Sequence, residues 1–171
     1  MNFNILSKSN LNFYLTLISQ PQKEKVIEYD KKEKIIFFNP DFIISPFHIK
    51  ISVNRSYYNI SNNKCKTKNE KKNIIFLSTN EEKLDKSLSI HSIENNTKNN
   101  YYVLFINMDK NEIDNIIKDL KGEEINEINY CKYENEECVI NHFNIKKEEV
   151  QSRKNGLENA VYNRISTKNL K

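Results

Sequence analysis

The side chains that could carry catalysis are few and widely spaced along the 171 residues of the chain. Its only two glycines, Gly122 and Gly156, lie too far apart to form a glycine-rich loop around a phosphate. His48, His91 and His142 are also scattered, and none of them stands in a sequence pattern with a serine or cysteine nucleophile. We therefore predict a protein that is not an enzyme and that needs no cofactor.

A metal site is also disfavoured by the spacing of the possible ligands. Cys138 and His142 are four residues apart and would share one face of a helix, with Cys131 seven residues before Cys138. Such a set still needs a fourth ligand, and the chain has no C-x-x-C pair, which is typical of zinc sites. Buried cysteines explain the pattern better. We interpret the acidic pairs at 123–124 and 136–137 as solvated charge and predict no metal.

A lysine-rich segment, residues 64–72, is the first candidate for a binding function. Its lysines are Lys64, Lys66, Lys68, Lys71 and Lys72. Together with Arg55 they could contact RNA phosphates in a salt-dependent way, and Tyr57 and Tyr58 could stack on unpaired bases. The alternatives are a solvated connection for the lysines and core packing for the tyrosines. A net charge of +4 does not decide between them.

Apolar runs predict the strands that must position these residues. Alternating side chains indicate a strand over 12–18, covered on both faces, to which residues 3–6 could pair. The clearest strand spans 101–107, and we expect a further core strand over 73–78. Residues 127–133 could form an edge strand. After the predicted strand at 12–18, residues 35–44 form a broken apolar stretch. Asn39-Pro40 interrupts it and forces a turn or a sheet edge.

A central helix is predicted to begin at Ser45-Pro46 and to end near residue 60. Serine can cap the free amides, and proline at the first helical position loses no hydrogen bond. One apolar face would carry Phe47, Ile51 and Tyr58. A second, roughly opposite, would carry Ile49, Val53, Tyr57 and Ile60. A helix with two such faces is either fully buried or has a partner.

Shorter helices are expected elsewhere. Residues 22–30 could form a short exposed helix, and residues 135–142 could form a short helix. Thr79 to Glu82 has capping-box spacing and would open a helix containing Leu84 and Leu88. A second capping signal at 109–112 opens a helix that Gly122 would stop.

The last helix is predicted over 147–165, weakened at Gly156 by roughly 1 kcal/mol relative to alanine. Its apolar stripe is Val150, Leu157, Val161 and Ile165, with Arg153 and Arg164 along the edge. The stripe could cover the sheet, with the arginines extended over a core edge. It could equally form an apolar patch ringed by basic residues for a partner.

The order of elements predicts one α+β domain over residues 1–171. Its sheet would be mainly antiparallel and packed with helices, including the long C-terminal one. The sequence has no apolar run long enough for a membrane span and no signal peptide at its start. Three cysteines fit a reducing compartment, so we expect a cytoplasmic or nuclear protein that is not secreted.

Two stretches carry a resemblance to a known family. The first comprises residues 39–47, NPDFIISPF, and the Asn54-Arg55 that follows it. The second is the tail 160–168, where the matching residues are Ala160, Arg164, Ser166, Thr167 and Lys168. Together they resemble the TPRKB-like family, the small kinase-regulatory subunit of the KEOPS (EKC) complex. Ser45 stands where the family has an acidic residue, and Ile51 to Val53 stand where it tends to have alanines.

The resemblance implies a non-catalytic regulatory subunit. Such a protein binds the small atypical kinase-ATPase of KEOPS and modulates it, in support of the threonylcarbamoyladenosine modification of tRNA. Some members also capture the tRNA acceptor end. The kinase contacts implied for this sequence are Leu157, Val161, Arg164 and Ile165. The RNA contacts are Arg55, Lys64, Lys66, Lys68 and Lys168.

Two other functions remain open at this point. The chain could be a free-standing RNA-binding module with no kinase partner, in which case its binding would fall steeply with salt. It could also be a small metabolic enzyme on a similar α+β sheet, but such an enzyme needs a polar pocket that nothing in the sequence supplies.

Overall fold

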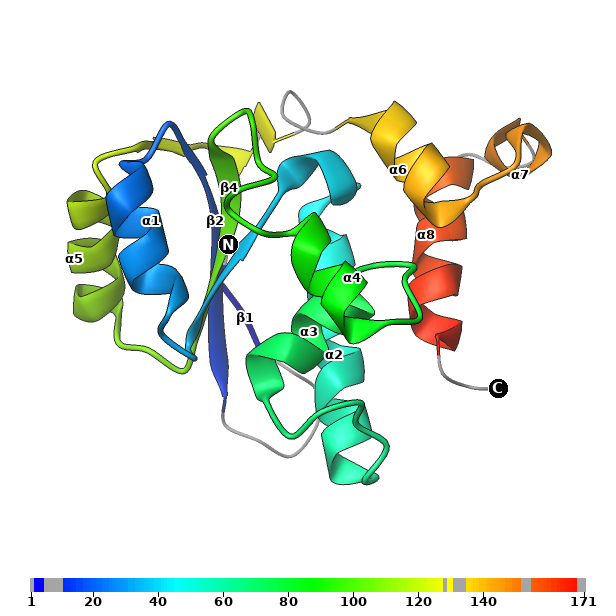
Figure 1. Cartoon of the computed structure of the whole chain (residues 1–171), viewed down its shortest axis with the longest axis horizontal. Coiled ribbons are helices and arrows are strands. Elements are labelled where there is room, and N and C mark those ends of the chain that lie inside the picture. Colours follow the sequence, from blue (N-terminus) through cyan, green and yellow to red (C-terminus); the bar gives the residue numbers. More distant parts are fainter. Residues whose placement is uncertain (1, 5–10, 128, 131–134, 152–154, 169–171) are drawn as a thin grey trace.

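An antiparallel sheet separates two groups of helices in this protein (Figure 1). The structure, a computed structural model, describes residues 2–4, 11–127, 129–130, 135–151 and 155–168. Its strands are β1 (Asn2–Asn4), β2 (Asn12–Ser19), β3 (Ile35–Phe38), β4 (Asn100–Ile106) and β5 (Glu123–Ile125). The strand order is β1-β2-β4-β3, and every pairing is antiparallel. β5 pairs with Leu17–Ser19 of β2, whereas β1 pairs with its beginning.

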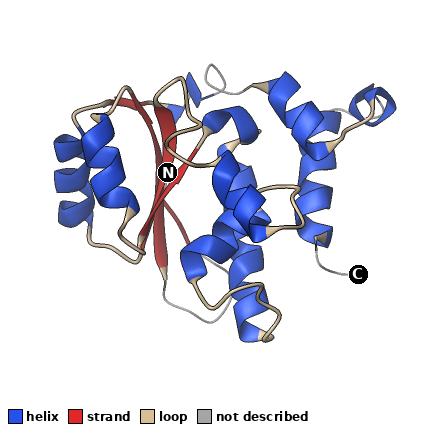
Figure 2. Cartoon of the chain, in the orientation of Figure 1, coloured by secondary structure: helices blue, strands red, loops and turns tan. Residues whose placement is uncertain are grey.

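The helices lie in layers around this sheet (Figures 1 and 2). One face is covered by α1 (Lys23–Asp30) and α5 (Lys110–Leu120). The other is covered by α2 (Pro46–Ser61) and α3 (Glu70–Leu77), with α4 (Leu84–Ile90) packed on α3. Beyond α2 lies a further group: α6 (Glu136–Phe143), α7 (Lys147–Gln151) and α8 (Gly156–Thr167). These elements confirm the predicted α+β class with an antiparallel sheet.

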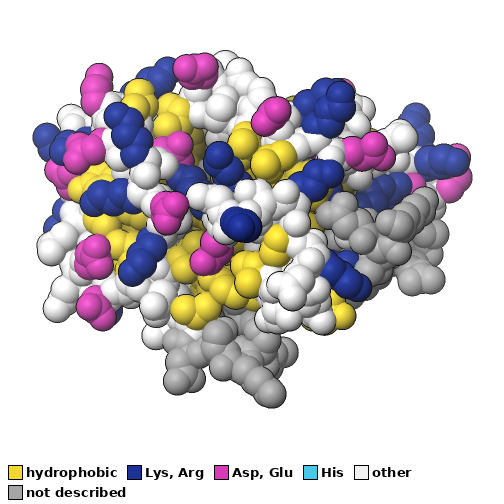
Figure 3. Space-filling view, turned by 60° about the horizontal axis from the view of Figure 1, so that its bottom comes forward, with side chains coloured by type: hydrophobic (Ala, Val, Ile, Leu, Met, Phe, Trp, Pro, Cys, Tyr) yellow, Lys and Arg dark blue, Asp and Glu magenta, His cyan; other side chains and the backbone are white. Residues whose placement is uncertain are grey.

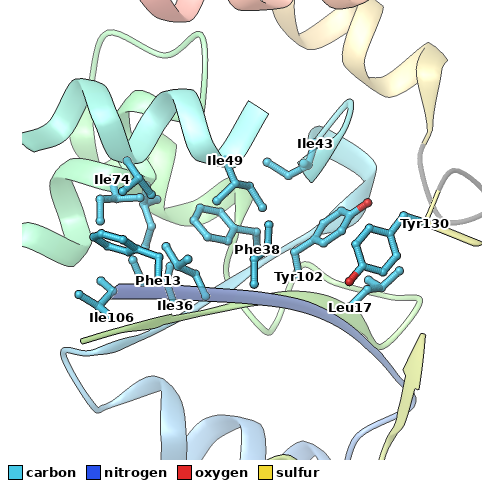
Figure 4. Close-up of a cluster of buried hydrophobic side chains, with 14 of the residues drawn as sticks. Phe13, Leu17, Ile36, Phe38, Ile43, Ile49, Ile74, Tyr102, Ile106 and Tyr130 are labelled. Carbon is cyan, nitrogen blue, oxygen red and sulfur yellow. The ribbon is translucent and has the colours of Figure 1, made fainter. Parts of the chain in front are cut away.

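The alternation of side chains along the strands divides the core in two. In β4, Tyr101, Val103 and Phe105 face α1 and α5. Tyr102, Leu104 and Ile106 point the other way, toward α2 and α3. Figure 4 shows this second cluster, in which side chains of the strands meet Ile49 of α2 and Ile74 of α3. The predicted strands at 12–18 and 101–107 are thus confirmed, including the burial of β2 on both faces.

The predicted core strand over 73–78 is wrong, because this segment belongs to helix α3. Its residues from Asn73 to Leu77 are all buried, and a short continuous apolar run does not distinguish a buried strand from a buried helix. The signal that decides is upstream. The Asn69 side chain accepts a hydrogen bond from the Lys72 amide at 2.9 Å, an N-cap that typically contributes about 1 kcal/mol.

The predicted starts of α2 and α5 are right in position but not in mechanism, whereas the predicted start of α4 is wrong in both. α2 begins at Pro46 as predicted, yet the Ser45 hydroxyl bonds to the Tyr162 hydroxyl at 2.7 Å rather than to a helix amide. α4 begins at Leu84 with Lys83 at its N-cap, so the capping box at Thr79 is wrong. α5 begins at Lys110 without a side-chain cap from Asp109. α6, in contrast, is capped by Asn135 as the predicted start at 135 requires.

Left-handed backbone is supplied by residues other than glycine in the described part of the chain. The residues with positive φ are Gln20, Asn63, Asn99, Asn107, Lys121, Asn144 and Asn155. Lys121 (φ 53°), not Gly122, is the left-handed residue that ends α5. Gly122 is required for a different reason, because there is no room for a side chain at this position. A Cβ there would lie 2.5 Å from Cγ2 of Ile18.

The predicted single helix over 147–165 is also wrong. Asn155 has φ 62°, which no right-handed helix allows, and it separates α7 from α8. A Cβ at Gly156 would collide with the main-chain oxygen of Val150, so the glycine permits the two helices to meet. Arg153, predicted at the edge of this helix, lies outside the described residues.

The remaining predicted edges are partly confirmed. β1 pairs with β2 near the expected place, although it spans Asn2–Asn4 and residues 5–6 lie outside the described part. The edge strand predicted over 127–133 is not seen at its described residues, and β5 lies just before them. Residues 127, 129 and 130 form a helical turn, and residues 128 and 131–134 lie outside the described part.

Candidate interaction surface on α2 and α8

The two faces of α2 have different surroundings. Ile49, Val53 and Tyr57 of the predicted second face are buried in the main core, whereas Ile60, the fourth residue of that face, is 38% exposed. Phe47 and Tyr58, on the predicted first face, are 49% and 51% exposed. Large apolar or aromatic side chains with this exposure on one helix mark the surface where a partner gains most from contact.

An aromatic pair connects this exposed face to α8. The rings of Phe47 and Tyr162 meet edge to face, with centroids 5.1 Å apart and an interplanar angle of 77°. The Tyr162 hydroxyl is held by Ser45. Ile51 of α2 packs against the buried apolar side chains of α8. The two helices therefore adjoin and form one continuous surface. Tyr162 was not identified from sequence, since it directly follows Val161 and lies beside the buried stripe rather than in it.

Arg55 lies at the other end of this surface. Its guanidinium carbon is 5.6 Å from the centroid of the Tyr58 ring, a cation–π arrangement. Nη2 donates to the main-chain oxygen of Lys168, just after α8, at 3.4 Å. Nε of Arg55 and Oδ1 of Asn54 are buried and have no hydrogen-bond partner among the described residues. Phe, Tyr and Arg, the three residue types along this surface, are enriched at protein interfaces.

The apolar stripe of α8 faces the interior of the chain. Leu157, Val161 and Ile165 are 8%, 0% and 0% exposed and pack with Val139 and Phe143 of α6. The prediction that the stripe covers the sheet is wrong, because its partners lie on helices, chiefly α6, and none of the residues clustered with it belongs to a strand. A partner that contacts α8 without opening it meets the opposite side of the helix.

Arg164 is held by hydrogen bonds within the protein. Nη1 and Nη2 donate to the two carboxylate oxygens of Glu149 at 3.1 and 2.9 Å, and Nη2 also donates to the Asn144 oxygen at 3.1 Å. These hydrogen bonds to Arg164 lower the pKa of Glu149 to about 2. Arg164 thus ties α7 and the end of α6 to α8, and its guanidinium remains about a quarter exposed.

The lysines predicted to contact RNA fall into two groups. Lys64, Lys66 and Lys68 are exposed on the connection between α2 and α3. Lys168 differs, because its Nζ lies 3.6 Å from the centroid of the Phe76 ring and donates to the Thr79 oxygen at 2.9 Å. It also donates to the main-chain oxygen of Phe76. Its amine is therefore occupied within the protein and is not directed toward a phosphate.

A groove between α1, α3 and α4 is a second concave region, with a volume of about 640 Å³. Ile27, Phe37 and Ile75 contribute to its apolar lining, whereas lysines and acidic residues both border it. Figure 3 shows one face of the molecule, on which apolar side chains reach the surface among charges of both signs. Mixed charge gives no preference for a partner, so α2 and α8 remain the stronger candidate.

Possible metal ligands are not gathered together in the described part of the chain. No group of three or more His, Cys, Asp or Glu residues within them could hold a metal ion. Cys138 is partly exposed rather than buried as predicted, and Cys131 lies outside the described part. None of the described helices is both long and apolar enough to cross a membrane.

Comparison with known families decides what kind of protein this surface belongs to. The model of the family described as kinase binding protein CGI-121 matches residues 15–169, which include α2, α8 and the connection 62–69. This chain belongs to the CGI-121 family. Curated proteins yield no match. The family description names a kinase as the binding partner, in agreement with the kinase partner that the sequence implies. Binding to a kinase suggests a regulatory role. The finer assignment to KEOPS and tRNA goes beyond that description.

Proposed function

We propose that this protein is a non-catalytic regulatory subunit that binds a kinase with the surface formed by the outer sides of α2 and α8. The observation that carries the proposal is the exposed pair Phe47 and Tyr58, which flanks Arg55 on a helix otherwise fixed in the core. A preformed, rigid platform loses little conformational entropy on binding. The family description supplies the kind of partner.

Charge around this surface supports an acidic partner. Residues 42–69, which include all of α2, contain no aspartate or glutamate but do contain Lys50, Arg55 and the three loop lysines. Acidic groups on the kinase would meet no like charge from α2 itself. Complementary charge at the rim of an interface chiefly raises the rate of association.

We further propose that the kinase is the atypical kinase-ATPase of KEOPS and that the complex modifies tRNA to threonylcarbamoyladenosine in the cytoplasm or nucleus. The resemblance at residues 39–47 and 160–168 supports this assignment. Arg55, Lys64, Lys66 and Lys68 would contact the tRNA acceptor end. Lys168 is left out of this set, because Nζ is bonded to main-chain oxygens of Phe76 and Thr79.

A free-standing RNA-binding module is the second candidate. The exposed and acid-free connection 62–69 favours it, since three lysines there have no acidic neighbour in sequence. The two functions differ in what they require. RNA binding by a free-standing module is tight without the kinase and weakens steeply with salt.

The test is association with the KEOPS kinase subunit from the same organism, measured by size-exclusion chromatography and calorimetry. We expect a one-to-one complex. Phe47→Ala and Tyr58→Ala should each weaken it about tenfold or more, which corresponds to roughly 1.4 kcal/mol. Ile27→Ala is the matched control, because Ile27 is 44% exposed on α1, across the sheet from α2.

Two outcomes would contradict the proposal. Separate elution of the two folded proteins would remove the kinase partner and favour the RNA-binding module. Full affinity in the folded double variant Phe47→Ala, Tyr58→Ala would leave the partner in place but move the surface elsewhere.

A further inference from the structure

Four titratable side chains from distant segments converge on the turn that follows α3. We call the turn formed by Ser78, Thr79 and Asn80 the hub. The side chains are His48 of α2, His91 after α4, His142 of α6 and Lys168 after α8. They include all three histidines of the chain. Each contacts a polar atom of the hub, so four segments depend on the position of one turn.

His48 and His91 hold Ser78 from two sides. The Ile44 amide donates to Nδ1 of His48, so Nε2 carries the proton and donates to the Ser78 main-chain oxygen at 2.8 Å. The Asn39 amide likewise donates to Nδ1 of His91, and Nε2 donates to the Ser78 hydroxyl at 3.1 Å. Both rings are at most 4% exposed. Protonating either ring would place a second N–H against a backbone N–H.

His142 repeats this arrangement at the end of the hub. The Asn80 amide donates to Nε2 of His142 at 3.0 Å, so the neutral ring carries its proton on Nδ1. Nδ1 lies 4.0 Å from Oε1 of Glu81. A proton gained at Nε2 would remove the acceptor of the Asn80 amide, although Glu81 would partly compensate for the charge.

Lys168 is the contact that reaches the interaction surface. Its Nζ donates to the main-chain oxygens of Phe76 and Thr79, which lie at the end of α3. Its own main-chain oxygen accepts from Arg55 of α2. Lys168 directly follows Thr167, the last residue of α8. A single residue therefore fastens the end of α8 to α3 through its side chain and to α2 through its backbone.

We propose that the hub is a proton-sensitive anchor that holds the end of α8 in place and that acid loosens it, weakening the α2–α8 surface. The link to kinase binding rests on the proposed function, whereas the anchor itself does not. Opening would free the end of α8 together with Lys168 and would remove the support that its backbone gives to Arg55.

All four groups respond to protons in the same direction. Burial lowers the pKa of Lys168 from 10.5 to about 7, with Glu81 raising it and Lys66 lowering it. Burial lowers the pKa of His48 and of His91 to about 3, and neighbouring histidines contribute to this lowering. Burial also lowers the pKa of His142, against Glu81 and with Lys168.

The sign of the pH effect follows from these directions. The open chain binds protons more readily than the closed one at all four sites, so opening becomes easier as the pH falls. Lys168 makes opening easier as the pH falls from about 10.5 to about 7, because these are its pKa values in the open and closed forms. The histidines contribute below about pH 6.5, their ordinary pKa.

Hydrogen exchange of the chain alone tests the anchor. Lys168→Met keeps most of the apolar stem and removes the amine, and Lys118→Met, on the exposed side of α5, is the control. After correction for the intrinsic pH dependence of exchange, we expect Lys168→Met to raise exchange at 76–80 and 160–168 at least tenfold. Exchange in wild type should rise between pH 9 and 7, and this rise should be absent from Lys168→Met. Equal exchange in wild type and Lys168→Met would overturn the proposal.

A second measurement keeps the test decisive if Lys168→Met does not fold. Titration of wild type by the ¹³Cε resonance of Lys168 should give a pKa near 7, and a value near 10.5 would show a free amine and overturn the anchor. With the KEOPS kinase subunit, wild type should bind more weakly at pH 6 than at pH 8, whereas Lys168→Met binds weakly at both. If the kinase does not bind at either pH, only the proposed function is contradicted. Hydrogen exchange tests the anchor in the chain alone, without the kinase.

Discussion

Arg164 and Glu149 form an ion pair with two hydrogen bonds, 3.1 and 2.9 Å long, that joins α8 to α7 across the left-handed Asn155. Arg164 belongs to the tail motif that resembles the TPRKB-like family, and it was expected to meet a kinase. In the isolated chain its guanidinium organises the C-terminal helices. Its side chain remains about a quarter exposed.

The first prediction concerns this pair and pH. Glu149 has its pKa lowered by Arg164, so the pair stabilises the fold above the ordinary carboxyl pKa of 4.5 and is lost as the pH falls toward 2. We expect Arg164→Ala to unfold at lower urea concentration than wild type at pH 7 and at nearly the same concentration at pH 2.5. A difference that persists at pH 2.5 would assign the effect to packing instead of charge.

The second prediction separates stability from binding on α8. Leu157 is buried among Val161 and the α6 side chains, so Leu157→Ala should lower the free energy of unfolding by about 2–4 kcal/mol. Phe47→Ala should lower it by less than about 1 kcal/mol, since Phe47 is half exposed. Urea unfolding measures both. Equal and small losses would mean that Leu157 is accessible to a partner after all.

The third prediction concerns the connection between α2 and α3. Lys64, Lys66 and Lys68 are exposed, so replacing all three by alanine should leave stability within about 0.5 kcal/mol. If they contact the tRNA acceptor end, the slope of log affinity against log salt should fall by about 2. The matched control replaces three lysines of the α5 region, Lys110, Lys118 and Lys121. An unchanged slope in the loop variant would exclude these contacts.

The fourth prediction uses neighbouring residues with opposite requirements. Gly122→Ala would press a methyl group onto Ile18 and the Ser19 oxygen, and should destabilise the fold by about 1–3 kcal/mol. Lys121→Gly should do the reverse and stabilise it by up to about 1 kcal/mol, because Lys121 is held at φ 53°. Thermal unfolding of both variants is the measurement. The same sign for both would refute the backbone assignment at the end of α5.

The fold class could be predicted because its signals are local. Alternation in β2 and β4 marks strands with two covered faces, and Ser45-Pro46 marks the start of α2 even though the serine does not cap it. Apolar runs without alternation are a different case. The run from Asn73 to Leu77 fits a strand or a helix equally well, and α3 is selected from outside the run, by the Asn69 cap and by packing against α2 and β3.

The site could be predicted less well, for a physical reason. Periodicity shows which side chains share a face, but it does not show what that face contacts. Leu157 and Phe47 both lie on apolar faces, yet one is buried against α6 and the other is exposed. The role of Lys168 depends on main-chain oxygens some ninety positions earlier in the chain, and no spacing rule reports a contact of that kind.

Five of the seven left-handed positions among the described residues are asparagines, in a chain with two glycines. Asparagine tolerates this conformation while restricting the unfolded backbone more than glycine does. Each such turn therefore costs less conformational entropy on folding than a glycine turn of the same shape. What looks in the sequence like a bias in composition therefore lowers, in the folded protein, the entropy cost of several separate turns.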